Sequence, residues 1–186
     1  TVDHNFPRYW SNRELAKFAH LFSGSVLNVS ADEDKNKEGG SYKDTFNSAE
    51  IYLTSNFFQN RPARPGEVFI DLEQEISSEM HNMADTVFNH TTLEHIFNCQ
   101  TAFKNLTKLS KDVFITFVPF IQKMHGQGRY NDFWRFTPEA MNKLYEENGL
   151  TLRYCSANNT GHASIYLFCI GYKNKKWDSY IPEYRE

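Results

Sequence analysis

Polar side chains able to bind a ligand or move a proton gather in two short segments of the chain. One runs from Asn89 to His95 and follows the apolar stretch Thr86–Phe88. The other contains His125, Asp132 and Arg135 and follows a longer apolar stretch. Imidazole changes its charge near neutral pH, so a histidine in either segment could act as a general base. We therefore expect the chemistry of this protein to occur in these two segments.

His125 is our candidate catalytic residue. It lies close to Gly126 and Gly128, in a polar stretch that is typical of a loop. A base there could remove the proton that an oxygen acceptor must lose when a group is transferred to it. A surface-loop histidine without a catalytic role is an equally good interpretation of the same residues.

Four further residues of the second segment are candidates for binding a substrate. Asp132 and Arg135 could form an ion pair that shapes the loop, or Arg135 could bind a carboxylate or phosphate of the substrate. Tyr130 and Trp134 could form a pocket wall that suits sugars and flat rings. The alternative, which we favour slightly, is that these aromatic residues only pack the loop against the rest of the domain.

His90, Glu94 and His95 are residue types that bind metal ions, but their spacing argues against a metal site. The zinc-protease pattern, with two histidines separated by three residues on a helix, is absent. On a helix, His90 and Glu94 would share one face and His95 would lie off it. Since the sequence shows no further set of ligands, we expect no bound metal. We expect these side chains to cap and orient the turn instead.

Helical segments are marked by capping residues and by apolar periodicity. Ser11, with Glu14 three residues later, fits a capping box, which predicts that the first helix begins at Ser11. Residues 99–109 carry apolar side chains at three- and four-residue spacing, which predicts a second long helix. Thr137 and Gly149 have the types expected at the start and just past the end of a third.

Seven short runs of apolar and β-branched residues predict strands. They alternate with helical segments until the last two, which a short polar loop joins and which should pair antiparallel. This order predicts an α/β fold with a doubly wound, mostly parallel seven-stranded sheet, helices on both faces and a C-terminal antiparallel strand pair. Pro119 should end the fifth strand. The predicted strands are 26–29, 51–53, 68–70, 86–88, 112–118, 150–155 and 163–172.

The carboxyl ends of these strands define where a ligand should bind, because doubly wound sheets bind ligands beyond those ends. The residues at the first five ends are Ser30, Thr54, Asp71, Asn89 and Pro119. Both polar segments described above follow such an end, so we expect them to lie near each other.

The length and charge of the chain limit its organisation and partners. A chain of 186 residues suits one domain, which we expect to span residues 1–186 with an N-terminal arm at 1–10 and a polar tail at 173–186. The net charge of −3 and the lack of a lysine- and arginine-rich block argue against a nucleic-acid partner. No apolar run approaches the roughly 20 residues of a membrane span. The oligomeric state is left open.

The cysteines indicate a reducing compartment. Cys99, Cys155 and Cys169 are odd in number and irregularly spaced, which argues against a disulfide framework. Cys155 and Cys169 fall in apolar strand-like runs, so we expect them to be buried and reduced. A cytoplasmic location follows from this expectation.

Two segments of the chain resemble class I S-adenosylmethionine-dependent methyltransferases. Residues 85–96, DTVFNHTTLEHI, are similar to the fourth strand of that family and the Leu-Glu-His turn after it. Residues 132–139, DFWRFTPE, are similar to one branch of the family, in which a Trp-Arg-Phe-Thr-Pro stretch follows the fifth strand. His125 and the stretch 147–150, ENGL, fit the same branch, and the element order agrees over about residues 11–172.

The resemblance implies the family's fold, its S-adenosylmethionine cofactor and a set of binding residues. The acceptor would be a small molecule, with a sugar or glycan suggested by the Trp-Arg-Phe-Thr-Pro branch, and O-methylation would use His125 as the base. The acceptor would contact Tyr130, Asp132, Trp134 and Arg135. The cofactor would contact Ser30, Ala31, Asp32, Asn56, Asp71, Asn89 and His90.

The chain departs from the family pattern where the cofactor should bind. The family has a glycine-rich turn after its first strand, whereas this chain has Ser30–Asp34 and no glycine before Gly39. The family has an acidic residue at the end of its second strand, whereas this chain has Asn56. Side chains in the turn restrict φ and keep the backbone farther from a ligand. Two hypotheses therefore stand: a working methyltransferase with a degenerate loop, which we favour, and an inactive methyltransferase-like domain that serves as a binding or scaffolding module.

Overall fold

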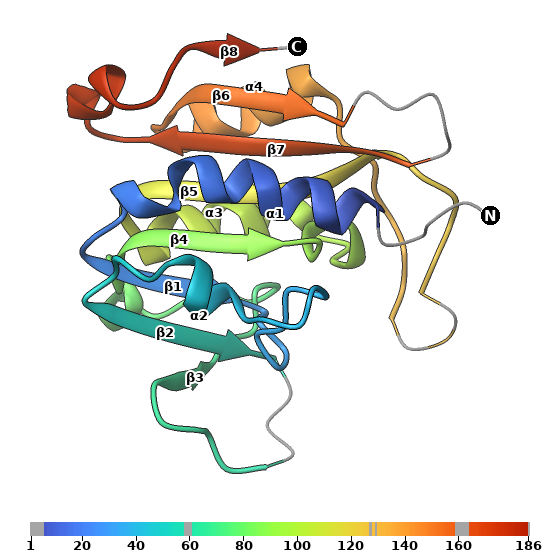
Figure 1. Cartoon of the computed structure of the whole chain (residues 1–186). Coiled ribbons are helices and arrows are strands. Elements are labelled where there is room, and N and C mark those ends of the chain that lie inside the picture. The colour runs from blue at the N-terminus through green and yellow to red at the C-terminus, as the bar shows by residue number, and fades with distance from the viewer. Residues whose placement is uncertain (1–5, 58–60, 127, 129, 159–163, 186) are drawn as a thin grey trace.

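The protein is an α/β domain with helices on both faces of one sheet, as its sequence predicts (Figure 1). The computed structural model describes residues 6–57, 61–126, 128, 130–158 and 164–185. Helix α1 lies on one face of the sheet, and α3 and α4 lie on the other. The helices are α1 (Phe6–Phe18), α2 (Tyr42–Thr45), α3 (Cys99–Leu109) and α4 (Pro138–Glu147).

The described sheet has eight strands in the order β3-β2-β1-β4-β5-β7-β6-β8. Neighbouring strands are parallel, except that β7 runs antiparallel to both β5 and β6. The order reverses direction between β1 and β4, which is the point where doubly wound sheets bind ligands. The strands are β1 (Ser25–Val29), β2 (Ile51–Asn56), β3 (Glu67–Phe69), β4 (Ala84–His90), β5 (Ser110–Ile121), β6 (Thr151–Ala157), β7 (Ile165–Tyr172) and β8 (Tyr184–Arg185).

Each face of the sheet buries its own apolar cluster. Leu15 and Phe18 of α1 pack on one face, in a cluster that includes Phe88. Phe103 of α3 and Tyr145 of α4 pack on the other face. The central strand β5 contributes to both clusters, which explains why its sequence is apolar without alternation.

The predictions for α3 and α4 are confirmed. Helix α3 occupies residues 99–109, as the periodicity indicates. Thr137 caps α4, because its side chain accepts a hydrogen bond from the backbone N–H of Ala140 at 3.1 Å. Gly149, just past the helix, has a φ of +76°, a conformation that favours glycine.

The prediction for the start of the first helix is wrong. Helix α1 begins at Phe6, so residues 6–10 of the expected arm are helical, and residues 1–5 lie outside the described part of the chain. Ser11 and Glu14 are interior residues whose side chains turn toward the sheet rather than capping the helix. The carboxylate of Glu14 accepts hydrogen bonds from Tyr154 Oη at 2.6 Å and Ser156 Oγ at 2.9 Å. These partners are 140 and 142 residues away in sequence, so a local pattern could not reveal them.

Several strands extend farther than predicted, and in β4 and β5 the extension changes the place of a named residue. Strand β4 runs to His90, so this histidine is a strand residue rather than a loop residue. Strand β5 continues through Pro119 to Ile121. Pro119 pairs with Tyr166 on β7. On its other side, β4 already ends opposite Phe117, so no strand residue there would accept a hydrogen bond from the N–H that proline lacks.

The C-terminal polar tail adds a short strand to the sheet, which corrects the expected seven strands to eight. Tyr184 and Arg185 pair with β6 as the short strand β8. Ile181 is fully buried in the α1-side cluster. A strand of two residues carries too little periodicity for sequence analysis to detect.

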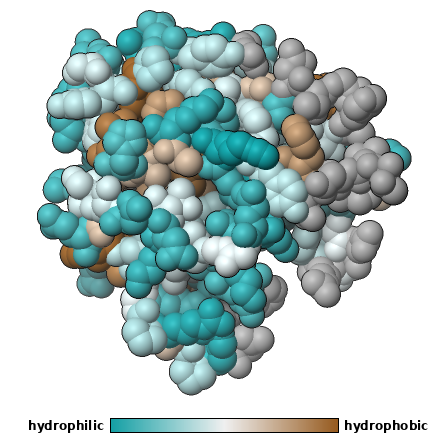
Figure 2. All heavy atoms as spheres, in the orientation of Figure 1, coloured by the Kyte–Doolittle hydropathy of each residue, from teal (hydrophilic) through white to brown (hydrophobic). Residues whose placement is uncertain are grey.

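The surface on the α1 side is mostly hydrophilic (Figure 2). Hydrophobic atoms on the described part of this face form separate patches rather than one continuous area. Among the described residues, no helix is both long and apolar enough to cross a membrane.

The buried Glu14 gives a test of how α1 is attached to the sheet. We expect Glu14→Ala to lower the free energy of unfolding by about 2–3 kcal/mol, because it leaves Tyr154 and Ser156 without their charged acceptor. Urea unfolding followed by circular dichroism measures this difference. Glu73→Gln, on an exposed residue, is the matched control and should leave stability unchanged. Equal stability of Glu14→Ala and wild type would contradict this account.

Candidate functional site

Parallel pairing brings the ends of β1, β4 and β5 to one edge of the sheet. Val29 at the end of β1 lies opposite Asn89 of β4, and Asn89 lies opposite Thr116 of β5. The loops that follow these strands therefore start side by side. The two polar segments of the sequence are brought together here, as predicted.

The loop after β1 adopts a backbone conformation that normally requires glycine. Ser30, Asp32 and Asp34 have φ values of +59°, +53° and +60°. Left-handed backbone costs roughly 1–2 kcal/mol for a residue with a Cβ, although aspartate tolerates it better than most. Alternate residues of this loop thus have a glycine-like backbone although none of them is glycine.

Asp34 holds the loop against the sheet. Its carboxylate accepts hydrogen bonds from Asn28 Nδ2 at 2.8 Å and from Tyr52 Oη at 2.7 Å. The other oxygen accepts a hydrogen bond from the backbone N–H of Lys43, near the start of α2, at 3.1 Å. Sequence analysis did not assign this role to Asp34, because its partners come from three separate elements.

Asn56, at the end of β2, contacts the same loop. Its Oδ1 accepts a hydrogen bond from the backbone N–H of Asp32 at 2.7 Å, and its Nδ2 donates to Glu67 at 2.6 Å. Glu67 in turn accepts two hydrogen bonds from Arg61, each at 2.7 Å. These bonds from Arg61 hold the pKa of Glu67 well below its ordinary value. Both polar atoms of the Asn56 side-chain amide are therefore hydrogen-bonded within the protein.

The backbone of the loop is tied to β2 as well. Ala31 N donates to Ser55 O at 2.9 Å, and Ser30 N donates to Ser55 Oγ at 3.3 Å. Asp71 lies apart from these contacts, on an exposed turn two residues after β3. Its Oδ1 accepts a hydrogen bond from the backbone N–H of Glu73 at 2.9 Å.

Asn89 is fully buried at the switch point of the sheet. Its Nδ2 donates to Val29 O at 3.0 Å and to Thr92 Oγ1 at 3.1 Å. Its Oδ1 has no hydrogen-bond partner among the described residues. A buried amide oxygen without a donor is costly, so this atom is a position where a ligand N–H or O–H would be stabilised.

His90 is enclosed beneath α1. Its Nε2 lies 2.9 Å from Ser11 Oγ, and its Nδ1 lies 3.1 Å from Thr91 Oγ1. The ring also packs on Phe117, with the ring centres 4.2 Å apart. Burial lowers the pKa of His90, so the ring is neutral at physiological pH. The side chain of His90 thus serves to attach α1 to β4.

The second polar segment is organised by the ion pair expected from the sequence. Arg135 donates to both carboxylate oxygens of Asp132, at 2.6 and 2.8 Å, and its proximity lowers the pKa of Asp132. The guanidinium also donates to the backbone carbonyls of Gln122 and Lys123, each at 3.1 Å. Arg135 therefore links Asp132 to the backbone of residues 122 and 123 and so stabilises the loop.

The backbone of His125 is held by the same carboxylate, whereas its ring Nδ1 makes no hydrogen bond to a described residue. Its backbone N–H donates to Asp132 Oδ2 at 2.7 Å, and its Nδ1 lies 3.2 Å from that oxygen. The side chain of His125 is about a quarter exposed (28%), so the ring can be reached from solvent. The structure thus gives His125 an acidic neighbour, which the spacing of the sequence alone did not assign to it.

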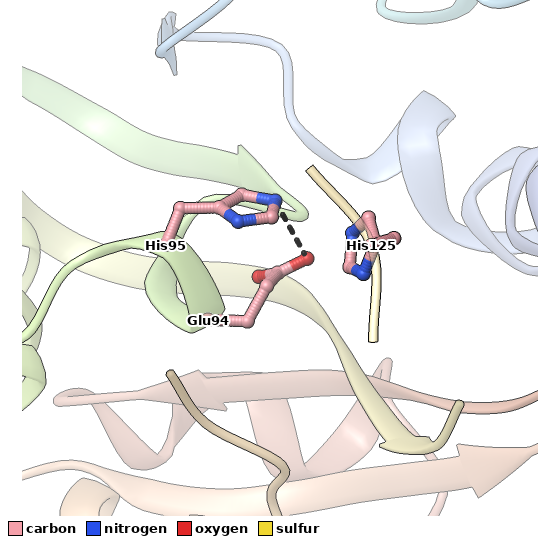
Figure 3. A group of neighbouring side chains, drawn as sticks. All are labelled: Glu94, His95 and His125. Carbon is pink, nitrogen blue, oxygen red and sulfur yellow. Dashed lines mark ion pairs between the residues drawn. The ribbon is translucent and has the colours of Figure 1, made fainter. Parts of the chain in front are cut away.

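Glu94 and His95 join His125 to form a cluster that the sequence did not predict (Figure 3). Both come from the turn Leu93–His95 after β4, whereas His125 comes from the loop after β5. Figure 3 shows the three side chains directed toward one another, and His95 Nε2 lies 3.6 Å from Glu94 Oε1. Burial raises the pKa of Glu94 to about 8. The cluster is not apparent from the sequence, because His125 is distant from the 90–95 segment along the chain.

Aromatic residues surround this cluster on the solvent side. The ring of Tyr130 lies 4.2 Å from that of His95, centre to centre. Trp134 donates from its indole N–H to the backbone carbonyls of Ile96 and Phe97, each at 3.0 Å. Phe97, Phe133 and Trp134 contact one another, and all three are more than a third exposed. These rings form an apolar rim beside the cluster.

Comparison with known proteins supports the fold. The sequence matches no protein-family model and no curated protein. In structure, the chain is similar to 1,6-didemethyltoxoflavin-N1-methyltransferase from Burkholderia thailandensis, solved with 1,6-didemethyltoxoflavin and S-adenosylhomocysteine bound. The two are 13% identical with a TM-score of 0.66, and the match covers 92% of this chain and 80% of that one.

A second similar structure is magnesium protoporphyrin IX methyltransferase from Synechocystis PCC 6803, solved with S-adenosylmethionine bound. It is 12% identical to this chain with a TM-score of 0.61, and the match covers 92% of this chain and 80% of that one. The chain therefore has the Rossmann-like fold of class I methyltransferases. At this level of identity the likeness establishes the fold alone.

The Arg61–Glu67 pair gives a pH-dependent prediction for the loop that holds Asn56. Because the folded-state pKa of Glu67 is lowered, its stabilising effect is fully present above the unfolded pKa of about 4.3. It is lost as the pH falls further. We expect Glu67→Gln to lower the melting temperature at pH 7 and to differ less and less from wild type below about pH 4. Thermal unfolding at a series of pH values measures this, and a pH-independent difference would contradict it.

Proposed function

We propose that this protein is an S-adenosylmethionine-dependent methyltransferase that acts on a small-molecule acceptor in the cytoplasm. The observation that carries this proposal is the left-handed backbone at Ser30, Asp32 and Asp34, directly after β1 and beside the switch point. A strained conformation of this kind persists only where the surrounding structure holds it, and it is common at ligand sites. The chain keeps this conformation at alternate residues although none of them is glycine.

The buried Asn89 is the clearest fit to a cofactor. Its unpartnered Oδ1 lies at the switch point and would accept a hydrogen bond from a cofactor amine or hydroxyl. Ser30, Ala31 and Asp32 would contact the cofactor through the loop after β1. Asn56 and Asp71, together with the backbone of His90, would complete the cofactor-binding set. Bound S-adenosylmethionine would supply an electrophilic methyl group.

The acceptor would bind beside the loop after β5. His125, whose Nδ1 lies beside Asp132, would take the proton that an acceptor hydroxyl loses as its oxygen attacks the methyl group. Catalysis would otherwise rest on positioning the acceptor oxygen in line with the methyl group. Arg135 would keep Asp132 in place, and the rim with Tyr130 and Trp134 would contact the acceptor. Exposed aromatic rings of this kind suit a sugar or a flat ring system, and we propose O-methylation of such a compound.

A catalytically inactive binding module is the second candidate, and the contacts of Asn56 favour it. Both polar atoms of the Asn56 side chain are already hydrogen-bonded within the protein. The backbone N–H groups of Ala31 and Asp32 also have internal acceptors. A cofactor would have to displace some of these bonds. Direct titration decides between the two candidates.

Calorimetric titration of the full chain with S-adenosylmethionine and with S-adenosylhomocysteine is the test. We expect heat of binding for both ligands, with one molecule bound per chain. Absence of heat at millimolar ligand, with the protein shown to be folded, would overturn the methyltransferase proposal and favour the inactive module.

Replacing Asp32 tests the strained loop itself. We expect Asp32→Gly to bind S-adenosylhomocysteine several-fold more tightly than wild type, since glycine adopts the required φ freely and lets a ligand approach the backbone. Asp32→Ala is the matched control, because it removes the same carboxylate but keeps a Cβ. Equal affinities of the glycine and alanine variants would show that the loop conformation does not limit binding.

Replacing His125 tests the proposed base. We expect His125→Ala to lower turnover by about 100-fold or more while leaving cofactor affinity nearly unchanged. Transfer of radiolabelled methyl groups to a panel of sugars and phenols measures turnover, and calorimetry measures affinity. An unchanged rate on an acceptor that wild type methylates would exclude His125 as the base.

A further inference from the structure

Glu94 is a buried carboxyl group that makes no hydrogen bond to another described residue. Its side chain has no exposed surface, and neither carboxylate oxygen is hydrogen-bonded to another described residue. An ionised carboxylate in this setting costs several kcal/mol unless a cation or donor compensates it. Glu94 is therefore stable in this position only if it carries a proton or if a cation binds beside it.

The hydrogen bonding of His95 places a lone pair toward Glu94. Its Nδ1 lies 2.6 Å from the backbone carbonyl of Asn131, and a carbonyl can only accept a hydrogen bond, so Nδ1 carries the hydrogen. In a neutral ring with hydrogen on Nδ1, Nε2 is an acceptor. It faces Glu94 Oε1 at 3.6 Å, and this oxygen is also an acceptor whenever the carboxyl group is ionised.

His125 completes the cluster from the other loop. Its Nδ1 lies 3.2 Å from Asp132 Oδ2, and a carboxylate beside one nitrogen of a metal-binding histidine is a common outer-sphere arrangement. The backbone carbonyl of Asn131 has the same relation to His95. An oxygen acceptor thus lies beside Nδ1 of each histidine, although only His95 Nδ1 is hydrogen-bonded to it, and Nε2 is the nitrogen left for a metal ion.

The spacing of the three side chains suits a small cation. One potential ligand atom from each of Glu94, His95 and His125 lies within 4.8 Å of the other two. Around a tetrahedral zinc ion, ligand atoms lie about 3.3 Å apart, so the side chains need to close by about 1.5 Å at most. Rotation of the partly exposed His125 can provide this movement.

We propose that Glu94, His95 and His125 form a binding site for a divalent transition-metal ion of the Zn²⁺ type. Two imidazoles and one carboxylate favour such an ion over Mg²⁺ or Ca²⁺, which prefer oxygen ligands. Three protein ligands leave one position open on the solvent side for water or for an acceptor oxygen. A role of the ion in activating that oxygen rests on the proposed function. Binding of the ion itself does not depend on the proposed function. With an ion bound, Nε2 of His125 is a metal ligand, so His125 would act as the base of the proposed function only in the metal-free protein.

Calorimetric titration of the chelator-treated full chain with Zn²⁺, without S-adenosylmethionine, tests the site. We expect one ion per chain, and a loss of affinity of about 100-fold in both Glu94→Gln and His125→Ala. His20→Gln, on an exposed histidine of the same chain, is the control and should bind as wild type does. Mg²⁺ should give no comparable binding.

Circular dichroism confirms that each variant is folded before titration. Glu94→Gln keeps the shape of the side chain and removes a buried ionisable group, so it should fold. Failure of wild type to bind Zn²⁺, or equal binding by wild type, Glu94→Gln and His125→Ala, would overturn the proposed site. Because no cofactor is present, either result leaves the test of S-adenosylmethionine binding unaffected.

Discussion

The parallel register of β1, β4 and β5 is the constraint on which the rest of the site depends. With Val29 opposite Asn89 and Asn89 opposite Thr116, the three strands end at one edge of the sheet. The loop after β1, the turn after β4 and the loop after β5 must therefore adjoin. Two apolar clusters, one on each face, fix this sheet between α1 and the pair α3 and α4. A shift of β4 by one residue would exchange its two faces and bury the wrong side chains.

At that edge, polar side chains stabilise a left-handed backbone, which glycine adopts without such help in a typical ligand-binding turn. Asp34 and Asn56 hold the loop after β1 through bonds to Tyr52 and to the backbone of Asp32. These bonds stabilise a left-handed backbone in residues that carry a Cβ. The same bonds also occupy groups that a cofactor could use. The loop therefore has the backbone conformation of a ligand-binding turn, but its hydrogen-bonding groups are already occupied. Whether a cofactor can displace these bonds decides between an active enzyme and a binding module.

Sequence analysis succeeds here where the signal is local. The cap at Thr137 and the periodicity of residues 99–109 mark α4 and α3 correctly. It fails where a distant partner decides the outcome. Glu14 fits a capping box with Ser11, yet it is held by residues of β6. In the same way, the spacing of Glu94 and His95 does not indicate a metal site, because the third residue, His125, belongs to the loop after a different strand.

The central claim is that the edge formed by β1 and β4 binds S-adenosylmethionine or its product. The most direct measurement is a two-dimensional NMR spectrum of the ¹⁵N-labelled chain, recorded while S-adenosylhomocysteine is added. Our account predicts that the backbone amide signals of Ala31, Asp32 and Asn89 shift in a saturable manner. Signals from the opposite edge, such as Ser25 and Lys111, should stay in place. A spectrum that does not change, or shifts confined to that opposite edge, would contradict the account.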